Sequence, residues 1–375
     1  MFSLVPMRNL TRTLVLFYLG LLPVLGLCKE YIVPTGDVSA FFAKLPADAT
    51  TVRFSAAAEY RANGDIVLPA RQLLVIDGAG SKLILGANSH GFTVRIADQQ
   101  EANKRTSSRY TIRDFAAIEG GRKAIDLKAT LGSTISNCRF TGQTEAAIDL
   151  RFCLMARVQN VLVTNPAKRG IVLRQGDWPG ANGANSQSNS TVLDQCRVFC
   201  SKTTTQAFTI LNTGGVRMTD CISEGAGPEH DLFLSATMDG NEESLARNPV
   251  VKSFHLSNFH VEHKARKASI YVNMPVKAVV DLQNVYWNGP QTAPVILYMS
   301  GQLNLTDIGW WDKGYVIATR VTAPRINVDR CHNGLSIDTK VGGAATRSGV
   351  LELRQPLLGQ ATLKLDHVRV QRPSM

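Results

Sequence analysis

A short repeated pattern constrains the fold of this chain more than any other feature. In each copy, an apolar residue and a polar residue are followed by Asp, Asn or a related side chain, and then by an apolar anchor. The nine anchors are Phe115, Cys138, Val161, Cys196, Cys221, Phe259, Val285, Ile308 and Cys331. Successive anchors lie 23, 23, 35, 25, 38, 26, 23 and 23 residues apart. This spacing predicts a repeated structural unit with two insertions.

A unit of this length has room for three short strands and three turns. No segment within it shows a sustained period of 3.6 residues, which disfavours a solenoid built from helices. The sequence therefore predicts an all-β fold, a right-handed parallel β-helix in which strands of successive rungs stack at about 4.8 Å. The Asn or Asp before each anchor suits a tight corner, because these residues tolerate left-handed backbone.

The two ends of the chain differ from the repeats. Residues 1–28 carry two arginines followed by an apolar run that is short for a membrane span, which predicts a secretory signal peptide and a secreted, periplasmic or extracellular protein. Cleavage is expected near Cys28, and a lipid anchor on Cys28 is the alternative. Residues 29–375 then form one β-helix domain. We expect a helical cap at 37–46, loop insertions at 175–190 and 236–249, and a C-terminal cap at 341–375.

Six cysteines follow the predicted leader, and several of them are anchors of the repeat. In an exported chain an even number of cysteines is typical of disulfides. Free cysteine also packs as a small apolar residue, so a buried ladder of thiols is the favoured interpretation. If one disulfide forms, Cys196 with Cys221 on adjacent rungs is the expected pair.

The charge balance points to an anionic partner. The chain contains 41 Lys and Arg against 30 Asp and Glu, a formal net charge of +11. Such a surplus bears on association and not on fold. Nucleic acid is disfavoured because the chain is expected to be exported and has no recognised binding module. After leader cleavage no membrane partner is expected, and the oligomeric state is left open.

The helical cap, the rungs and the apolar-x-Asn/Asp-apolar corner resemble the pectate-lyase-like superfamily of right-handed β-helices. The resemblance spans nearly the whole mature chain and implies an architecture. Members include polyuronide lyases, uronate epimerases, glycoside hydrolases, tailspikes and adhesins, so function depends on the site. The chain lacks the Gly-His-Gly of polygalacturonase-like hydrolases and the Asp-Pro-His-Asp of alginate epimerases.

In those relatives the substrate lies along one sheet, whose strands usually begin with a Gly-Ile-like pair. Here that sheet is predicted to include residues 124–128, 147–151 and 170–174. Alternation turns their Ile and Leu side chains inward and the intervening residues outward. Lys128, Arg151 and Arg174 are therefore expected to stack on consecutive rungs.

These residues suggest a lyase that cleaves a uronate-containing polysaccharide by β-elimination. Arg151 and Arg174 are candidate clamps for the uronate carboxylate, because guanidinium binds carboxylate in bidentate fashion. Lys128, His230 or Tyr271 is a candidate acid or base.

Further residues are assigned to substrate or metal. Candidate substrate-binding residues are Asp126, Asp149, Lys168, Arg169 and Trp178. Trp178 either offers its face to a sugar ring or pins its own loop to the sheet. A Ca²⁺ ion held by Asp126, Asp149, Glu229 and Asp231 is the alternative to a metal-free reaction.

Other interpretations of the same residues remain open. A solvated Asp/Lys/Arg ladder with no ligand is the plainer interpretation of the stacked charges. At the level of function, the alternatives are a non-catalytic β-helix that binds glycans or forms a surface scaffold, and a glycoside hydrolase.

Overall fold

The protein is a long solenoid of parallel strands, seen here in a computed structural model. The structure describes residues 29–236, 253–263, 265–274, 278–288, 295–299, 301–308, 315–319, 325–330, 335–338, 349–353, 362–364 and 368–371. The predicted leader, residues 237–249 of the second insertion, Cys331 and most of 341–375 lie outside these ranges. Every strand pairing between named strands is parallel, which confirms the predicted all-β parallel β-helix.

One face of the solenoid is a 12-stranded sheet with one strand per rung. Its strands are β4 (Ile66–Val67), β7 (His90–Thr93), β10 (Lys123–Leu131), β12 (Ala146–Leu154), β14 (Arg169–Arg174), β17 (Gln206–Leu211), β19 (His230–Ser235), β21 (Ile270–Met274), β23 (Val295–Met299), β25 (Tyr315–Thr319), β27 (Leu335–Asp338) and β29 (Thr362–Lys364).

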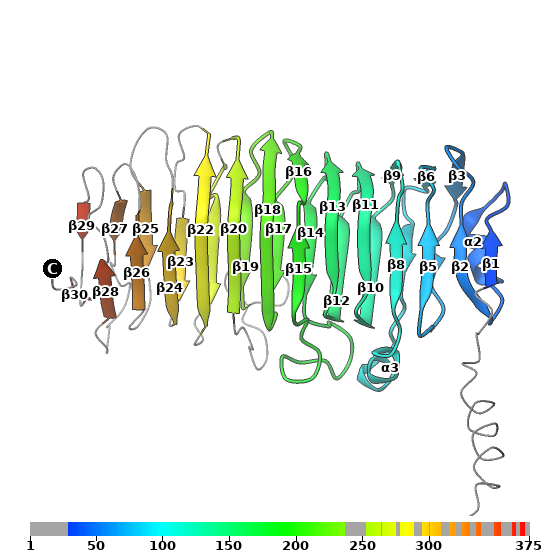
Figure 1. The fold of residues 1–375 in the computed structure, drawn as a ribbon, viewed down its shortest axis with the longest axis horizontal. Helices are drawn as coiled ribbons and strands as arrows, with labels where there is room; N and C mark the ends of the chain where they lie inside the picture. Colours follow the sequence, from blue (N-terminus) through cyan, green and yellow to red (C-terminus); the bar gives the residue numbers. More distant parts are fainter. Residues whose placement is uncertain are drawn as a thin grey trace, which may run out of the picture.

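The remaining strands form an 18-stranded sheet that bends around a corner. They are β1 (Lys29–Ile32), β2 (Ala49–Arg53), β3 (Glu59–Ala62), β5 (Leu74–Asp77), β6 (Lys82–Leu85), β8 (Tyr110–Arg113), β9 (Ala117–Gly120), β11 (Thr134–Thr141), β13 (Arg157–Thr164), β15 (Thr191–Asp194), β16 (Arg197–Cys200), β18 (Gly215–Gly225), β20 (Ser253–Val261), β22 (Val279–Trp287), β24 (Gln302–Thr306), β26 (Arg325–Asp329), β28 (Gly349–Leu353) and β30 (Val368–Gln371). Figure 1 shows this sheet in front, with the rungs running from β1 to β30.

The corner lies at the polar residue before each anchor of the repeat. All nine of these residues have positive φ, between 48° and 59°. They are Asp114, Asn137, Asn160, Gln195, Asp220, Asn258, Asn284, Asp307 and Arg330. The prediction of a left-handed corner at this position is therefore confirmed, and one residue per rung turns the chain from one strand segment to the next.

The core is a stack of apolar side chains inside the coil. In the 12-stranded sheet, Ile125, Ile148 and Ile171 occupy equivalent positions on consecutive rungs and are fully buried. The five described cysteines are free and buried, which agrees with the thiol-ladder interpretation. Burial raises the pKa of the Cys138, Cys153 and Cys200 thiols to about 12, so they pack as neutral groups.

Two short helices flank the solenoid. Helix α2 (Val38–Ala43) lies at the N-terminal end with Asp37 as its N-cap, and it buries Val38 and Phe42, as expected for the cap. Helix α3 (Gln99–Arg105) was not expected, because it has no apolar periodicity. Its signals are the Asp98 N-cap and basic residues in its last turn. In the described part, neither helix is long and apolar enough to cross a membrane.

Candidate functional site

Seven charged side chains meet on the outer face of β10, β12 and β14, and we call them the charged cluster. They are Lys123, Asp126, Lys128, Asp149, Arg151, Arg174 and Asp177. Lys128 pairs in register with Arg151, which pairs with Arg174. The predicted stacking of these three cations on consecutive rungs is thus confirmed.

The cations are interleaved with carboxylates instead of forming an open basic stripe. Asp126 and Asp149 occupy the row beside them and are each 2% exposed. Four cations therefore face three carboxylates, which leaves one net positive charge. The pairing of these side chains therefore agrees with the Asp/Lys/Arg ladder interpretation, since alternation places an acidic row and a basic row next to each other.

Asp126 is held by cations from its own rung and the next. Its Oδ1 accepts from Arg151 Nη2 at 3.1 Å and from Lys123 Nζ at 3.3 Å. Its Oδ2 lies 3.1 Å from Lys128 Nζ and accepts from the Thr93 hydroxyl at 3.1 Å. Burial by itself would raise the pKa of Asp126, but the surrounding cations, Arg151 first, outweigh it and hold the pKa below its usual value.

Asp149 occupies the centre of the cluster. Arg174 donates to it in bidentate fashion, Nε to Oδ1 at 2.9 Å and Nη2 to Oδ2 at 2.8 Å. Lys123 Nζ and Arg151 Nη2 donate to Oδ2 at 2.7 and 3.0 Å. Burial again opposes ionisation, and Arg174, Arg151 and Lys123 together hold the pKa of Asp149 well below its usual range. The Arg151 and Arg174 pKa values are raised in turn.

Asp177 is the most exposed member of the cluster, with a side chain 36% exposed. It lies in the first insertion, three residues after β14 ends. Arg151 Nη1 donates to both of its oxygens, and Arg174 Nη1 lies 3.3 Å from Oδ2. The cation side chains beneath are 17%, 11% and 14% exposed for Lys128, Arg151 and Arg174. Sequence reasoning missed Asp177, although an acidic residue three positions beyond a ladder arginine was a usable signal.

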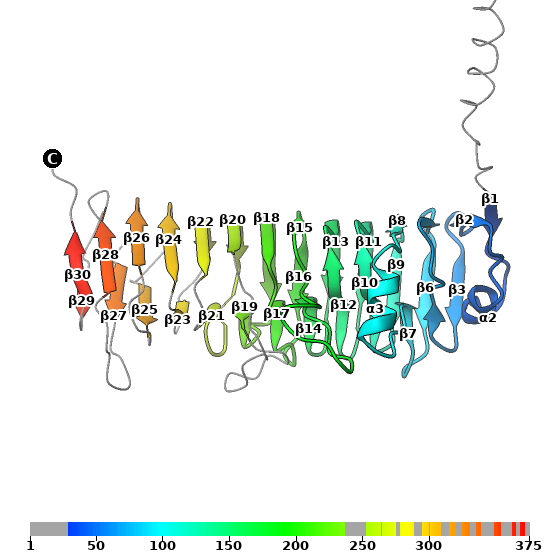
Figure 2. The same cartoon turned by 90° about the horizontal axis from the view of Figure 1, so that it is seen from below.

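The wall beside the cluster is made by the first insertion and α3. Trp178 is 7% exposed and packs at 6.2 Å against the ring of Phe152. Its Nε1 donates to Gln99 Oε1 at 3.0 Å, and Gln99 also donates from its side chain to the Asn185 carbonyl. Figure 2 shows α3 and the loop after β14 on the same side of the solenoid. Trp178 therefore pins its own loop to the sheet, which is one of the two roles predicted for it.

His230 and Tyr271 lie in a second group further along the same face. Tyr271 stacks on Phe233 with ring centroids 4.7 Å apart, and His230 packs against both rings. All three are at most 3% exposed. His230 Nδ1 lies 2.8 Å from the Ala268 carbonyl oxygen. The rungs of β12, β14 and β17 therefore separate His230 from Lys128, and Tyr271 lies one rung further away, beyond β19.

The four proposed calcium ligands are not brought together. Asp231 turns inward, where Ser223 and Ser269 each donate to it at 2.7 Å, and Glu229 lies 3.1 Å from Lys267. Asp231 is three rungs from Asp149, about 14 Å at the usual strand spacing. All four oxygens of Asp126 and Asp149 already face donors, and the described residues contain no cluster suited to a metal. This donor set does not fit calcium.

The two remaining predicted substrate-binding residues differ in position. Arg169 begins β14, in the same row as Lys123 on the outer face. Lys168 is exposed in the preceding turn, and its carbonyl accepts from Thr205. Both lie near the start of β14, whereas Arg174 lies at its end, in register with Lys128.

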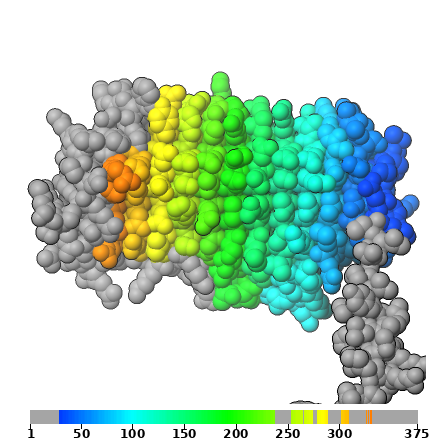
Figure 3. Space-filling view, in the orientation of Figure 1, coloured from blue at the N-terminus to red at the C-terminus, as the bar shows by residue number. Residues whose placement is uncertain are grey.

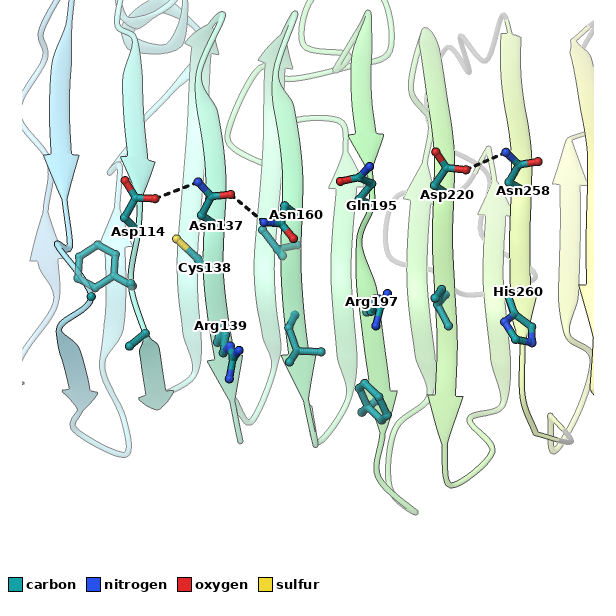
Figure 4. A pocket seen from close by; sticks show the side chains of 17 residues that line it. Asp114, Asn137, Cys138, Arg139, Asn160, Gln195, Arg197, Asp220, Asn258 and His260 are labelled. Carbon is teal, nitrogen blue, oxygen red and sulfur yellow. Dashed lines mark hydrogen bonds between the residues drawn. The ribbon is translucent and has the colours of Figure 1, made fainter. Parts of the chain in front are cut away.

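A groove among the described residues lies elsewhere, along the corner of the 18-stranded sheet. It has a volume of about 1390 Å³. Its floor is formed by the corner residues Asp114, Asn137, Asn160, Gln195, Asp220 and Asn258, as Figure 4 shows. From the sequence, these residues are predicted only to form turns.

The fold is shared with proteins of known structure. The catalytic domain of a GH87 alpha-1,3-glucanase in complex with nigerose aligns with 92% of this chain and 68% of its own, at 12% identity and a TM-score of 0.52. The A-module of the mannuronan C-5 epimerase AlgE4 from Azotobacter vinelandii aligns with 90% of this chain and 96% of its own, at 13% identity and a TM-score of 0.53. These likenesses show the fold alone, a parallel β-helix, which agrees with the predicted architecture. No protein-family model and no curated protein matches the chain.

Proposed function

We propose that this protein is a polysaccharide-active β-helix protein that engages an anionic, uronate-containing polysaccharide at the charged cluster. The observation that carries the proposal is the register of Lys128, Arg151 and Arg174 on three consecutive rungs beside the loop pinned by Trp178. Proteins of similar structure include a glucanase and a mannuronan epimerase, and their action on polysaccharides agrees with the proposal.

The route of a ligand into this cluster runs through Asp177. This side chain is more exposed than the arginines that it binds. A uronate carboxylate carries the same charge and the same bidentate geometry as Asp177. We propose that the uronate displaces Asp177 from Arg151 and Arg174, while Asp126 and Asp149 keep both guanidinium groups in place.

The proposed reaction is β-elimination. A base takes the proton from C5, the electron pair forms the C4–C5 double bond, and the C4–O bond breaks as the leaving oxygen takes a proton. Lys128, beside the two arginines, is the base or acid candidate for this site, because His230 and Tyr271 lie four and five rungs from it and would not reach the same uronate. Neutralisation of the uronate by Arg174 and Arg151 lowers the cost of the carbanion that forms at C5.

The test is incubation with alginate, pectate, hyaluronan and chondroitin while the ultraviolet absorbance of unsaturated uronate ends is recorded, with and without calcium. Elimination by the protein, and its loss in Arg151→Ala, is the expected result. If elimination required calcium, a metal ion bound elsewhere, and not the arginine clamp, would neutralise the uronate carboxylate. New reducing ends without absorbance would identify a glycoside hydrolase instead.

A non-catalytic role is the second candidate, and the pairing of the cluster favours it. Every cation in the cluster contacts at least one carboxylate. Saturable binding of a polyuronate with no product of either kind would support a glycan-binding or scaffold protein. Export is a separate proposal, and mass spectrometry of the protein recovered outside the cytoplasm, beginning near residue 29, would test it.

A further inference from the structure

The corner of the 18-stranded sheet bears a line of hydrogen-bonded amides on its outer surface. Asn137 Nδ2 donates to Asp114 Oδ1, and Asn160 Nδ2 donates to Asn137 Oδ1, each at 2.9 Å. Further along, Asn258 donates to Asp220 at 2.7 Å. Figure 4 shows both segments along the floor of the groove.

The line is interrupted in the middle of the groove. Among the described residues, neither the Asn160 Oδ1 nor the Gln195 carboxamide has a hydrogen-bond partner. Both side chains are exposed and line the groove. They therefore offer acceptors and donors to a ligand rich in hydroxyl groups.

Arginines flank this line in a regular order. Arg139 and Arg197 lie on one side, with Leu162 between them in the register of β11, β13 and β16. Arg157 and Arg217 lie on the other side, beyond the residues that line the groove, with Val192 between them in the register of β13, β15 and β18. Four consecutive rungs thus carry one arginine each, alternately on the two sides of the amide line.

These four arginines are available to a ligand. All four are exposed, and none forms an ion pair within the part of the chain that the structure describes. Figure 4 places Arg139, Arg197 and His260 on the same side of the amides. In Figure 3 the rungs of this face lie side by side, and no other described segment crosses them.

The counter-charges in the groove lie towards its ends. Asp114 accepts from Asn137 and lies 3.5 Å from Arg113, while Asp220 accepts from Asn258. The stretch from Asn137 to Gln195 has no carboxylate among its lining residues, although Asp194, on the side of Arg157 and Arg217, lies just outside that lining. This central stretch is where charge complementarity favours an anion.

We propose that this groove, together with the adjoining strand face that carries Arg157 and Arg217, is a second binding site, for an extended linear polyuronate in which each sugar ring is rotated by half a turn relative to the one before it. In an extended β-1,4-linked chain, each ring is rotated by half a turn relative to the previous one, so carboxylates point alternately to opposite sides. One ring spans close to one rung spacing of about 4.8 Å. The alternating arginines match this pattern of charge, and the amides between them face the ring hydroxyls.

A single-stranded nucleic acid fits the groove less well. Its charges run along one backbone, and binding without sequence preference usually depends on aromatic platforms for the bases. In the described lining, the aromatic side chains near the arginines are Phe199, half-buried on β16, and His260 on β20. The groove is separate from the charged cluster, so the inference stands independently of the proposed function.

Calorimetric titration with β-1,4-linked oligomannuronates of increasing length tests the inference. Two paired variants remove the arginines of one side or the other, Arg139→Ala with Arg197→Ala and Arg157→Ala with Arg217→Ala. The matched control, Arg61→Ala with Arg95→Ala, removes two exposed arginines near the N-terminal end. Each groove pair should weaken binding roughly tenfold, the control less than about twofold, and affinity should rise with length up to the tetramer.

Several outcomes would overturn it. Equal binding of uncharged cello-oligosaccharides would remove the role of the arginines, and an effect of only one pair would contradict the alternating geometry. Tighter binding of single-stranded DNA would assign the groove to nucleic acid. If Arg174→Ala abolished binding and both groove pairs bound as tightly as the unmodified protein, all binding would lie at the charged cluster. The proposed function would then remain intact.

Discussion

Asp177 accepts hydrogen bonds from Nη1 of Arg151 at 2.7 and 2.8 Å, which joins a loop carboxylate to a guanidinium on the sheet. The same guanidinium donates through Nη2 to Asp126 and Asp149 on two successive rungs. Arg151 therefore connects the rigid face of the solenoid with the insertion.

The first prediction concerns pH. The pKa of Asp149 is depressed in the folded protein, so its ionised form contributes stability that is present above its unfolded pKa of about 4 and is lost as the pH falls through the folded value. Asp149→Asn should lower the free energy of unfolding by about 3–5 kcal/mol at neutral pH, because buried cations lose their partner. In the variant, the free energy of unfolding should also fall less steeply as the pH is lowered through the acid range.

Urea denaturation across the acid range measures both effects. Asp220→Asn is the control, since it makes the same change on the exposed corner, where the next rung has asparagine at the same position, Asn258. Equal losses in the two variants would contradict the special role of the buried cluster.

The second prediction concerns the loop wall. Trp178→Ala removes the contact with Phe152 and the hydrogen bond to Gln99, so loop 175–190 should be cleaved by protease roughly tenfold faster. Gly176→Ala should act similarly, because its new Cβ would lie 2.4 Å from the indole. Limited proteolysis with mass spectrometry measures the site and rate of cleavage. Unchanged cleavage in both variants would show that the loop is held by other contacts.

The third prediction concerns the corner. Asn137 has φ of 53°, which costs a β-branched residue about 1–2 kcal/mol, so Asn137→Val should lose that amount in addition to the amide hydrogen bonds. Asn137→Gly keeps the backbone angle and isolates the loss of those bonds, about 1 kcal/mol. Urea midpoints compare the two variants. A glycine variant as unstable as the valine variant would argue against backbone strain as the cause.

The fold was largely predictable, because a parallel β-helix repeats its constraints on every rung. The polar residue before each anchor turned the corner at all nine positions, including Gln195 and Arg330, which lack the usual Asn or Asp. Helix α3 was not predictable from apolar periodicity, since in its seven residues only Ala102 is buried.

The site was predictable only in part. Alternation along the strands placed Lys128, Arg151 and Arg174 in one stack. It gave no information about Asp177 and Gln99, which reach the site from irregular segments. The arginines flanking the corner were missed for another reason: their alternation appears only when two strand segments of successive rungs are aligned.

The most direct test of the charged cluster as a polysaccharide site is titration of oligouronates into variants that change Asp177 and Arg174, in the Arg139→Ala, Arg197→Ala background that weakens the groove. Asp177→Asn removes the carboxylate that competes for the arginines, so it should tighten binding roughly tenfold, while Arg174→Ala should weaken it by a similar factor. Asp48→Asn, an exposed change at the N-terminal end, should have no effect. Equal affinities for Asp177→Asn, Arg174→Ala and their parent would contradict the account.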